Sequence, residues 1–435
     1  MHALWNIIIT LCWPLLYLYP PFRGTIGRRL GRFELGAYDP AAAGLKVLIN
    51  AVSAGEVVAI TPFIQKLRAR CPHVQIVMLT TTASGQTMAK EKLGAAVDLL
   101  AFFPLIDLPF VVRRYLDRLK PDIYISTESE LWPNIMAECN RRKIPVVLAN
   151  ARIYLHNKRG WRGRLHHRLL ALVDRILCQS EEQYDNFVKF GIAPAKLATT
   201  GNIKFDFELP GWDAARLADW RGKWGLGDEQ VVVIGSTHEG EEQLLLTALS
   251  RLEEHPRWEG EPRPRRIVIA PRHVERVEDV RRITGGLGYN AATMAEVEAG
   301  GGTDWQVLIV DRYGVLVDMY RLADLVIMGG TFNRKVGGHN LLEATALGKP
   351  VLIGPYTFSI KAQVRMLADE QAVSSVADSD DLRGLIAERL AADLSHPARL
   401  ADTGHVAQQL TLANRGAAVK TAEEVLALTG RNPPD

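Results

Sequence analysis

Glutamate residues follow two of the apolar runs that have the length and composition of buried strands. Glu56 ends the loop Asn50-Ala-Val-Ser-Ala-Gly-Glu56 and lies in the first turn of the helix predicted over residues 56–70. Backbone N–H groups and the helix dipole favour an ionised carboxylate at that position. Such a carboxylate can accept a proton, so Glu56 is a candidate general base. An ordinary first-turn acidic residue is the alternative, because acidic residues are enriched there.

A second acidic loop, with Glu128 and Glu130, follows the strand predicted over residues 123–126, and Pro133 then suits the first position of a helix. This loop suits either a reaction site or simple helix capping. Lys204 lies near the end of the same half of the chain and could balance a phosphate or carboxylate. A solvated Lys204 paired with Asp206 is the alternative.

Residues suited to binding a phosphate occur in the second half of the chain. Arg272 follows the apolar run 267–270, and arginine binds phosphate in bidentate fashion. The stretch Gly337-Gly-His-Asn340-Leu-Leu-Glu343 combines paired glycines with the start of a helix. Paired glycines let the backbone approach a phosphate, and a helix N-terminus attracts it. Glu343 could accept hydrogen bonds from a ribose diol, whereas a plain glycine-rich turn is the alternative.

These loops must be positioned by strands that alternate with helical stretches, a pattern typical of parallel βαβ units. Two series of candidate strands lie on either side of Leu209-Pro-Gly-Trp212, which we interpret as a linker. The first series covers residues 47–51, 76–80, 99–103, 123–126, 146–149 and 176–179, and the second covers 231–235, 267–270, 307–310, 325–328 and 351–354. We therefore predict an α/β protein with two Rossmann-like, doubly wound domains that face a cleft, with ligands at the carboxyl ends of the strands.

The N-terminal segment differs in composition from the rest. Residues 3–22 carry no charged side chain, and about 20 such residues can span or nearly span a bilayer. Arg23, Arg28, Arg29 and Arg32 follow, which predicts a cytoplasmic body. Because Pro14 interrupts the segment, a shallow interfacial helix is as consistent with the sequence as a full span.

Composition and charge exclude several classes of protein. A chain of 435 residues with a net charge of +3 suits two folded domains and argues against nucleic acid as a partner. The basic stretch 152–175, which contains Arg162, Arg164 and Arg168, suits anionic lipid head groups or a solvated helix face. Asp378-Ser-Asp380 precedes the helix predicted over residues 381–391 and is interpreted as a capping cluster, so no metal site is predicted.

Together and in this order, the motifs resemble the 3-deoxy-D-manno-octulosonic acid (Kdo) transferase family. The resemblance extends from the N-terminal segment to about Val373. The matching stretches are Ala51-Val-Ser-Ala-Gly-Glu56, Glu128-Ser-Glu-Leu-Trp-Pro-Asn134, Leu148-Ala-Asn-Ala-Arg152, Gly201-Asn-Ile-Lys-Phe-Asp206, Ser236-Thr-His-Glu-Gly-Glu-Glu242, Pro271-Arg-His273, Gly337-Gly-His-Asn340 and Gly354-Pro-Tyr-Thr-Phe358.

The resemblance implies a GT-B fold and an inverting transfer of Kdo from CMP-Kdo to the lipid A precursor (lipid IVA) in lipopolysaccharide biosynthesis, with no metal and no cofactor. It implies a membrane anchor over residues 1–24, an acceptor domain over 25–207, a CMP-sugar domain over 208–410 and a terminal helix and tail over 411–435. Glu56 would be the general base, and Glu128 and Lys204 would support the transition state. The implied CMP contacts are Pro271, Arg272, Tyr313, Gly314, Val315, Asn340, Leu341, Leu342 and Glu343. The implied location is the cytoplasmic side of the cell inner membrane.

The chain departs from the family pattern near the implied nucleotide contacts. Tyr313-Gly314-Val315 stands where the family has Met-Gly-Glu, and Leu341 replaces a proline. Another GT-B enzyme, such as a UDP-sugar transferase or epimerase, therefore stays an alternative, as does a non-catalytic lipid-binding scaffold. The number of Kdo units added and the oligomeric state are not determined by the sequence.

Overall fold

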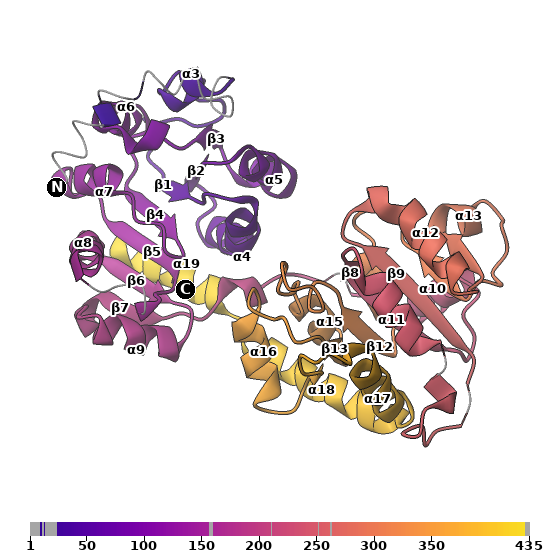
Figure 1. Ribbon diagram of the computed structural model, residues 1–435. Coiled ribbons are helices and arrows are strands. Elements are labelled where there is room, and N and C mark those ends of the chain that lie inside the picture. The colour runs from indigo at the N-terminus through magenta and orange to yellow at the C-terminus, as the bar shows by residue number, and fades with distance from the viewer. Residues whose placement is uncertain are drawn as a thin grey trace. The chain divides into compact units, whose positions relative to one another are not determined.

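The computed structural model describes residues 9–10, 13, 24–155, 160–209, 211–250, 252–261 and 263–430, and for Arg162 it describes the backbone only. The chain divides into two units. Unit 1 comprises Met1–Phe207 and Asn414–Asp435, and unit 2 comprises Glu208–Ala413 (Figure 1).

Unit 1 is built on a seven-stranded parallel sheet with the order β3-β2-β1-β4-β5-β6-β7. Its strands are β1 Lys46–Asn50, β2 Gln75–Thr80, β3 Leu99–Phe102, β4 Ile123–Thr127, β5 Val146–Ala151, β6 Arg175–Cys178 and β7 Leu197–Thr199. The strand order reverses between β1 and β4, and parallel sheets bind ligands outside the carboxyl ends of the strands at such a point. Glu56 lies in the first turn of the helix that follows β1, and Glu128 lies in the loop directly after β4.

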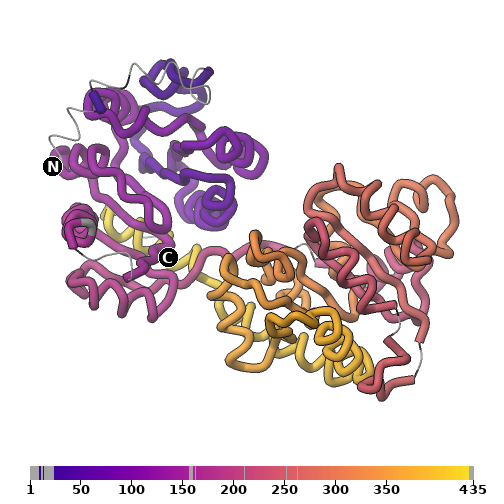
Figure 2. Tube along the Cα trace, viewed as in Figure 1, coloured from indigo at the N-terminus to yellow at the C-terminus, as the bar shows by residue number. Residues whose placement is uncertain are grey.

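Helices cover both faces of the unit 1 sheet (Figure 1). One face packs against α4 Ala54–Arg70, α5 Ala83–Leu93 and α19 Ala417–Leu428. The other packs against α3 Ile26–Arg29, α6 Pro109–Leu119, α7 Pro133–Arg141, α8 Gly160–Ala171 and α9 Glu181–Lys189. The helix α19 belongs to this unit because the chain returns after unit 2 and places its last described helix beside α4 (Figure 2).

Unit 2 repeats the architecture with the strand order β10-β11-β9-β8-β12-β13-β14, again all parallel. Its strands are β8 Gln230–Thr237, β9 Arg265–Pro271, β10 Ala291–Thr293, β11 Val307–Ile309, β12 Leu325–Met328, β13 Val351–Ile353 and β14 Ser374–Ser375. Its helices are α10 Ala214–Lys223, α11 Glu241–Leu249, α12 Val277–Gly286, α13 Met294–Glu298, α14 Leu316–Leu322, α15 Leu342–Ala346, α16 Lys361–Ala368, α17 Leu382–Leu394 and α18 Pro397–Ala413.

The predicted fold class, α/β with two Rossmann-like domains of the GT-B type, is confirmed by these two parallel sheets. The strands β7, β10 and β14 were not predicted, because each has only two or three residues and consists mostly of alanine, threonine or serine, so no apolar run marks it. The predicted N-terminal anchor lies outside the described residues except for Ile9, Thr10 and Trp13. Among the residues that the structure describes, no helix is both long and apolar enough to cross a membrane.

Candidate functional site

Glu56 lies in the first turn of α4, directly after the carboxyl end of β1. Its Oε2 accepts hydrogen bonds from the Val52 backbone N–H at 2.7 Å and from the Thr127 hydroxyl at 3.0 Å. The side chain of Ser53 caps the helix by accepting from the Glu56 N–H. The carboxylate is therefore turned back toward the loop between β1 and α4. One donor from that loop and one donor from β4 hold it in place.

The environment of Glu56 raises the pKa of its carboxyl above the ordinary value. Burial is the largest cause, and the negative charge of Glu128 adds to it. The hydrogen bonds from Val52 and Thr127 and the positive charge of Lys204 act in the opposite direction. Burial therefore outweighs the hydrogen bonds and the positive charge that favour the ionised carboxylate. A carboxylate with a raised pKa is a better proton acceptor near neutral pH.

Glu128 follows β4 in a left-handed backbone conformation, with φ of 55°, and its side chain is buried. Its N–H donates to the Ala149 carbonyl at 2.9 Å, which extends the pairing of β4 with β5. One carboxylate oxygen accepts from Lys204 Nζ at 2.7 Å, and the other pairs with the Arg152 guanidinium. Two cations therefore hold this buried carboxylate in one orientation.

Lys204 belongs to a short turn, Ile203–Phe205, that follows β7. The alternative that Lys204 pairs with Asp206 is wrong, because Lys204 pairs with Glu128. Asp206 instead accepts the N–H groups of Gly416 and Ala418 at the start of α19. Glu56, Glu128 and Lys204 therefore lie together at the carboxyl edge of the unit 1 sheet.

The glycine-rich stretch of unit 2 needs its glycines. Gly337 and Gly338 have φ of 75° and 96°, which only glycine adopts readily. A Cβ on Gly337 would lie 2.5 Å from the Phe358 ring, and a Cβ on Gly338 would lie 2.7 Å from Ile360. Backbone atoms here approach neighbouring segments more closely than any other residue type allows.

The predicted nucleotide contacts fall in three loops that follow strands of unit 2. Pro271 ends β9, and the side chain of Arg272 is exposed with no hydrogen bond or ion pair to the residues that the structure describes. Tyr313 is 61% exposed, and its hydroxyl lies 3.4 Å from the Val274 N–H, beside the loop after β9. Gly314 has φ of 86°, and Val315 occupies the N-cap position of α14, with no side-chain hydrogen bond to the helix.

The third loop carries the residues from Asn340 to Glu343. The side chains of Leu341 and Leu342 are fully buried, so any contact of theirs with a ligand must use the backbone. The Leu341 N–H donates to the Gln363 side chain at 2.9 Å, and the Asn340 side chain accepts from the Leu342 N–H at 3.3 Å. Asn340 is exposed and Glu343 is half-buried in the first turn of α15.

Several side chains at these edges were not singled out from the sequence. Thr127 bonds Glu56, and Arg152 bonds Glu128. In unit 2, His238, His273 and His339 come together beside Arg272. Each of these residues lies in or directly beside one of the motifs described above. Their position after a predicted strand is the signal that could have identified them. Their partners could not be read from the sequence, because they lie in other loops.

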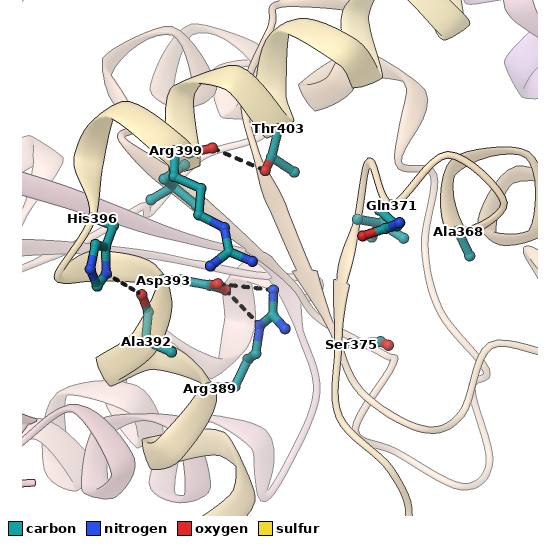
Figure 3. Close-up of a pocket in the computed structure, with 11 residues that line it drawn as sticks. Ala368, Gln371, Ser375, Arg389, Ala392, Asp393, His396, Arg399 and Thr403 are labelled. Atoms are coloured by element: carbon teal, nitrogen blue, oxygen red, sulfur yellow. Dashed lines mark hydrogen bonds and ion pairs between the residues drawn. The ribbon is translucent and has the colours of Figure 1, made fainter. Parts of the chain in front are cut away.

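One hollow of about 240 Å³ in unit 2 contains none of the predicted site residues (Figure 3). It lies between the segment before β14 and the ends of α17 and α18. Arg389 enters it but is already paired with Asp393 and bonded to the Ser374 hydroxyl at 2.7 Å. This hollow is therefore separate from the loops that follow the carboxyl ends of the strands.

Within the described ranges, no three His, Cys, Asp or Glu side chains are grouped as metal ligands would be. Asp381, rather than Asp378 or Asp380, caps α17 by accepting the Gly384 N–H at 3.0 Å. In the basic stretch, Arg164 and Arg168 are exposed on α8 together with Trp161, which is 54% exposed. The side chain of Arg162 lies outside the described part of the chain.

Comparison with known proteins identifies close relatives. A family model described as 3-deoxy-D-manno-octulosonic-acid transferase (kdotransferase) matches residues 25–207. The chain is 33% identical over 403 residues to the 3-deoxy-D-manno-octulosonic acid transferase of Bordetella pertussis, covering 91% of this chain and 90% of the relative. The identity to the Haemophilus influenzae transferase is 29% over 422 residues, with 94% of each chain covered. A glycosyltransferase structure from Rickettsia africae has a TM-score of 0.60 at 14% identity, over 90% of this chain and all of that one.

Proposed function

Because the chain belongs to the 3-deoxy-D-manno-octulosonic acid (Kdo) transferase family, we propose that it transfers Kdo from CMP-Kdo to a lipid A precursor in lipopolysaccharide biosynthesis. The reaction is a single displacement that inverts the anomeric centre. CMP-Kdo and the phosphorylated lipid acceptor are its substrates, and Glu56, Glu128 and Lys204 are its catalytic residues.

The observation that carries this proposal is the fixed, half-buried carboxylate of Glu56 beside the ion pair of Glu128 and Lys204. Glu56 takes the proton of the acceptor hydroxyl while that oxygen attacks the anomeric carbon of Kdo. A positioned base of this kind contributes about 10²–10⁴-fold to the rate. The Kdo donor carries a carboxylate of its own, and Lys204 is a nearby cation that can balance negative charge.

Unit 2 is proposed to hold the donor. The exposed Arg272 guanidinium supplies a cation for the phosphate, and Gly337 and Gly338 let the backbone come close to it. Tyr313 stands where the family has methionine. Its large exposed ring can stack on the base of CMP, where the methionine of the family would make an apolar contact. We assign Glu343 to the ribose diol.

We further infer that the protein works at the cytoplasmic side of the inner membrane. The apolar residues 3–22 and their arginine flank support attachment. The exposed Trp161 with Arg164 and Arg168 on α8 adds a surface suited to anionic lipid head groups.

The test is transfer from CMP-Kdo to a lipid A precursor, followed by mass spectrometry of the product. We expect the acceptor mass to rise by one or more Kdo units and Glu56→Gln to reduce the rate about 100-fold or more, with CMP binding unchanged. Glu91→Gln, an exposed residue of α5, is the matched control and should leave the rate as it is. Unchanged turnover in Glu56→Gln would refute the assignment of the base, and stabilisation of the protein by UDP but not CMP would refute the donor.

A further inference from the structure

Three histidines from three separate loops of unit 2 come together at the carboxyl edge of its sheet. His238 follows β8, His273 follows β9, and His339 lies in the glycine-rich stretch after β12. The ring centroids of His238 and His273 are 5.9 Å apart, and the rings are steeply inclined. The Nε2 atoms of His238 and His339 are 2.8 Å apart.

The His238 and His339 rings meet edge to edge. Their planes differ by only 7°, and their centroids are 5.1 Å apart. Two flat rings whose nitrogen atoms point straight at each other give a centroid separation equal to the N···N distance plus the two distances from ring centre to nitrogen. Face-to-face stacking would not bring the two Nε2 atoms to 2.8 Å. The contact is therefore an in-line N–H···N hydrogen bond.

Such a bond fixes where the protons of the pair lie. One Nε2 carries a hydrogen and the other does not, since two N–H groups cannot point at each other. In the neutral pair, the ring that accepts at Nε2 must carry its own hydrogen on Nδ1. Neither Nδ1 has a hydrogen-bond partner among the residues that the structure describes. The pair thus presents one N–H donor that the protein leaves open.

Glu241 and Gly330 hold the pair in place. The buried Glu241 carboxylate accepts hydrogen bonds from the backbone N–H groups of His238 and Gly330, both at 2.8 Å. It therefore joins the loop after β8 to the turn after β12. A Cβ on Gly330 would lie 2.9 Å from Cδ2 of His339, so glycine leaves room for the second ring. The geometry of the pair is built by the fold of unit 2.

The charges around the pair favour an anion. Burial, followed by His238, Arg272 and His273, lowers the pKa of His339 to about 4, and burial, followed by His273, Arg272 and Arg276, lowers the pKa of His238. The Glu242 carboxylate also influences His238, but the Arg276 guanidinium already binds it at 2.6 and 3.1 Å. Two other carboxylates lie nearby: Glu241, which accepts hydrogen bonds from the backbone N–H groups of His238, Gly330 and Phe332, and Glu275, which lies 3.9 Å from His273. The pair is therefore neutral near pH 7 and lies next to unbalanced positive charge.

We propose that His238 and His339 form a proton-coupled site for the phosphate of CMP, and this inference rests on the proposed function. When the phosphate dianion binds, the pair takes one proton from solvent, so that both Nδ1 atoms donate to phosphate oxygens beside Arg272. A sugar-linked CMP carries one negative charge on its phosphate, and the CMP released when the bond to Kdo breaks carries two. The pair therefore interacts more strongly with the leaving group than with the bound donor.

Isothermal titration of the full chain with CMP at pH 7.5, in buffers of different ionisation enthalpy, measures the protons taken up. We expect uptake of up to about one proton per CMP, because the anion stabilises the charged pair. His339→Gln should abolish the uptake and weaken CMP binding about tenfold, as expected for loss of a charge-assisted hydrogen bond. Gly330→Ala should reduce the uptake with all three imidazoles still present. His405→Gln, an exposed histidine of α18, is the matched control and should behave as the unsubstituted protein.

The outcomes separate this inference from the proposed function. CMP binding without net proton uptake, or with uptake retained in His339→Gln, would overturn the role of the histidine pair and leave the donor assignment standing. A complete lack of CMP binding by the unsubstituted chain would overturn the donor assignment, and the histidine site with it.

Discussion

The pKa of the Glu56 carboxyl is set by influences that act in opposite directions. Burial and Glu128 raise its pKa, whereas two hydrogen bonds and Lys204 lower it. Thr127 is the donor whose contribution can be tested by substitution, because its hydrogen bond comes from a side chain. Its single hydroxyl hydrogen has two possible acceptors. The Glu56 carboxylate is 3.0 Å away and the Asn50 carbonyl 3.1 Å away. An ionised Glu56 is the stronger acceptor, so it holds the hydrogen of Thr127.

Removing that hydroxyl should change the pH dependence of transfer. In Thr127→Val the ionised form of Glu56 loses a hydrogen bond, which raises its pKa further. A base acts in its ionised form, so activity is lost as pH falls through that pKa. The acid limb of kcat/KM should therefore move upward by about 0.5–1 pH unit. The measurement is the pH profile of initial transfer rates.

Two further variants make this prediction specific. Thr127→Ser keeps the hydroxyl and should restore the original acid limb. Thr61→Val removes a hydroxyl that bonds the Val57 carbonyl within α4 at 2.8 Å, and it should leave the limb in place. An acid limb that is the same in Thr127→Val and in the unsubstituted protein would show that Thr127 does not influence the base.

The sequence predicted where the acidic residues of unit 1 lie but not how they pair. Glu56 and Glu128 were placed after strands by the alternation of apolar runs, which is a local signal. The pairing of Lys204 with Glu128 depends on the left-handed turns at Glu128 and Asn150, and Asn150 accepts the N–H of Ile203 at 3.0 Å. Such non-local contacts leave no periodic trace in the sequence.

At the scale of elements, Asp206 connects the loop that carries Lys204 to the terminal helix α19. Its carboxylate accepts two N–H groups at the start of that helix, where Gly416 adopts a left-handed conformation. A carboxylate at this position is favoured by the helix dipole as well as by the hydrogen bonds. The position of Lys204 therefore depends on a helix more than 200 residues further along the chain.

Loss of this cap should affect both stability and activity. Asp206→Ala should lower the free energy of unfolding by about 0.5–2 kcal/mol, the usual cost of a lost N-cap. It should also reduce kcat, because the turn that carries Lys204 loses its anchor. Asp213→Ala removes the cap of α10 in unit 2, where Asp213 accepts the Arg216 N–H at 2.8 Å. Chemical denaturation and transfer assays of the two variants provide the comparison.

The two caps should differ in one respect only. Both variants should lose stability, but only Asp206→Ala should lose activity beyond the fraction of protein that unfolds. Equal kcat in the two variants would contradict the coupling of α19 to Lys204.

For elements, hydrophobic pattern predicted the long central strands well, and β12 begins and ends where the apolar run 325–328 does. The sequence also predicted a terminal helix and tail over residues 411–435, a range that contains the end of α18 and all of α19. It could not show that these two helices belong to different units. That depends on which core their buried faces complete, and alanine-rich faces such as that of α19 fit many partners.

At the scale of the whole molecule, unit 1 is made from two distant parts of the chain, whereas unit 2 is continuous. Within unit 1, α19 contributes buried side chains to the core beside α4 and α5, and the largest are Val425 and Leu426. Burying two such side chains contributes about 3–6 kcal/mol. A folded domain is typically stable by only about 5–15 kcal/mol. Unit 1 should therefore depend on the last helix, and unit 2 should not.

A single charge on α19 should separate the stabilities of the two units. Leu426→Asp places a carboxylate in the unit 1 core, so unit 1 should unfold at a temperature lower by about 10 °C or more. Leu428→Asp on the same helix, where the side chain is 36% exposed, should change that temperature little. Hydrogen exchange of the full chain on heating identifies the unit that opens. In Leu426→Asp, faster exchange in β1 and β4 with unchanged exchange in β8 and β12 is expected, because each sheet has its own core. Simultaneous opening of both sheets would contradict independent units.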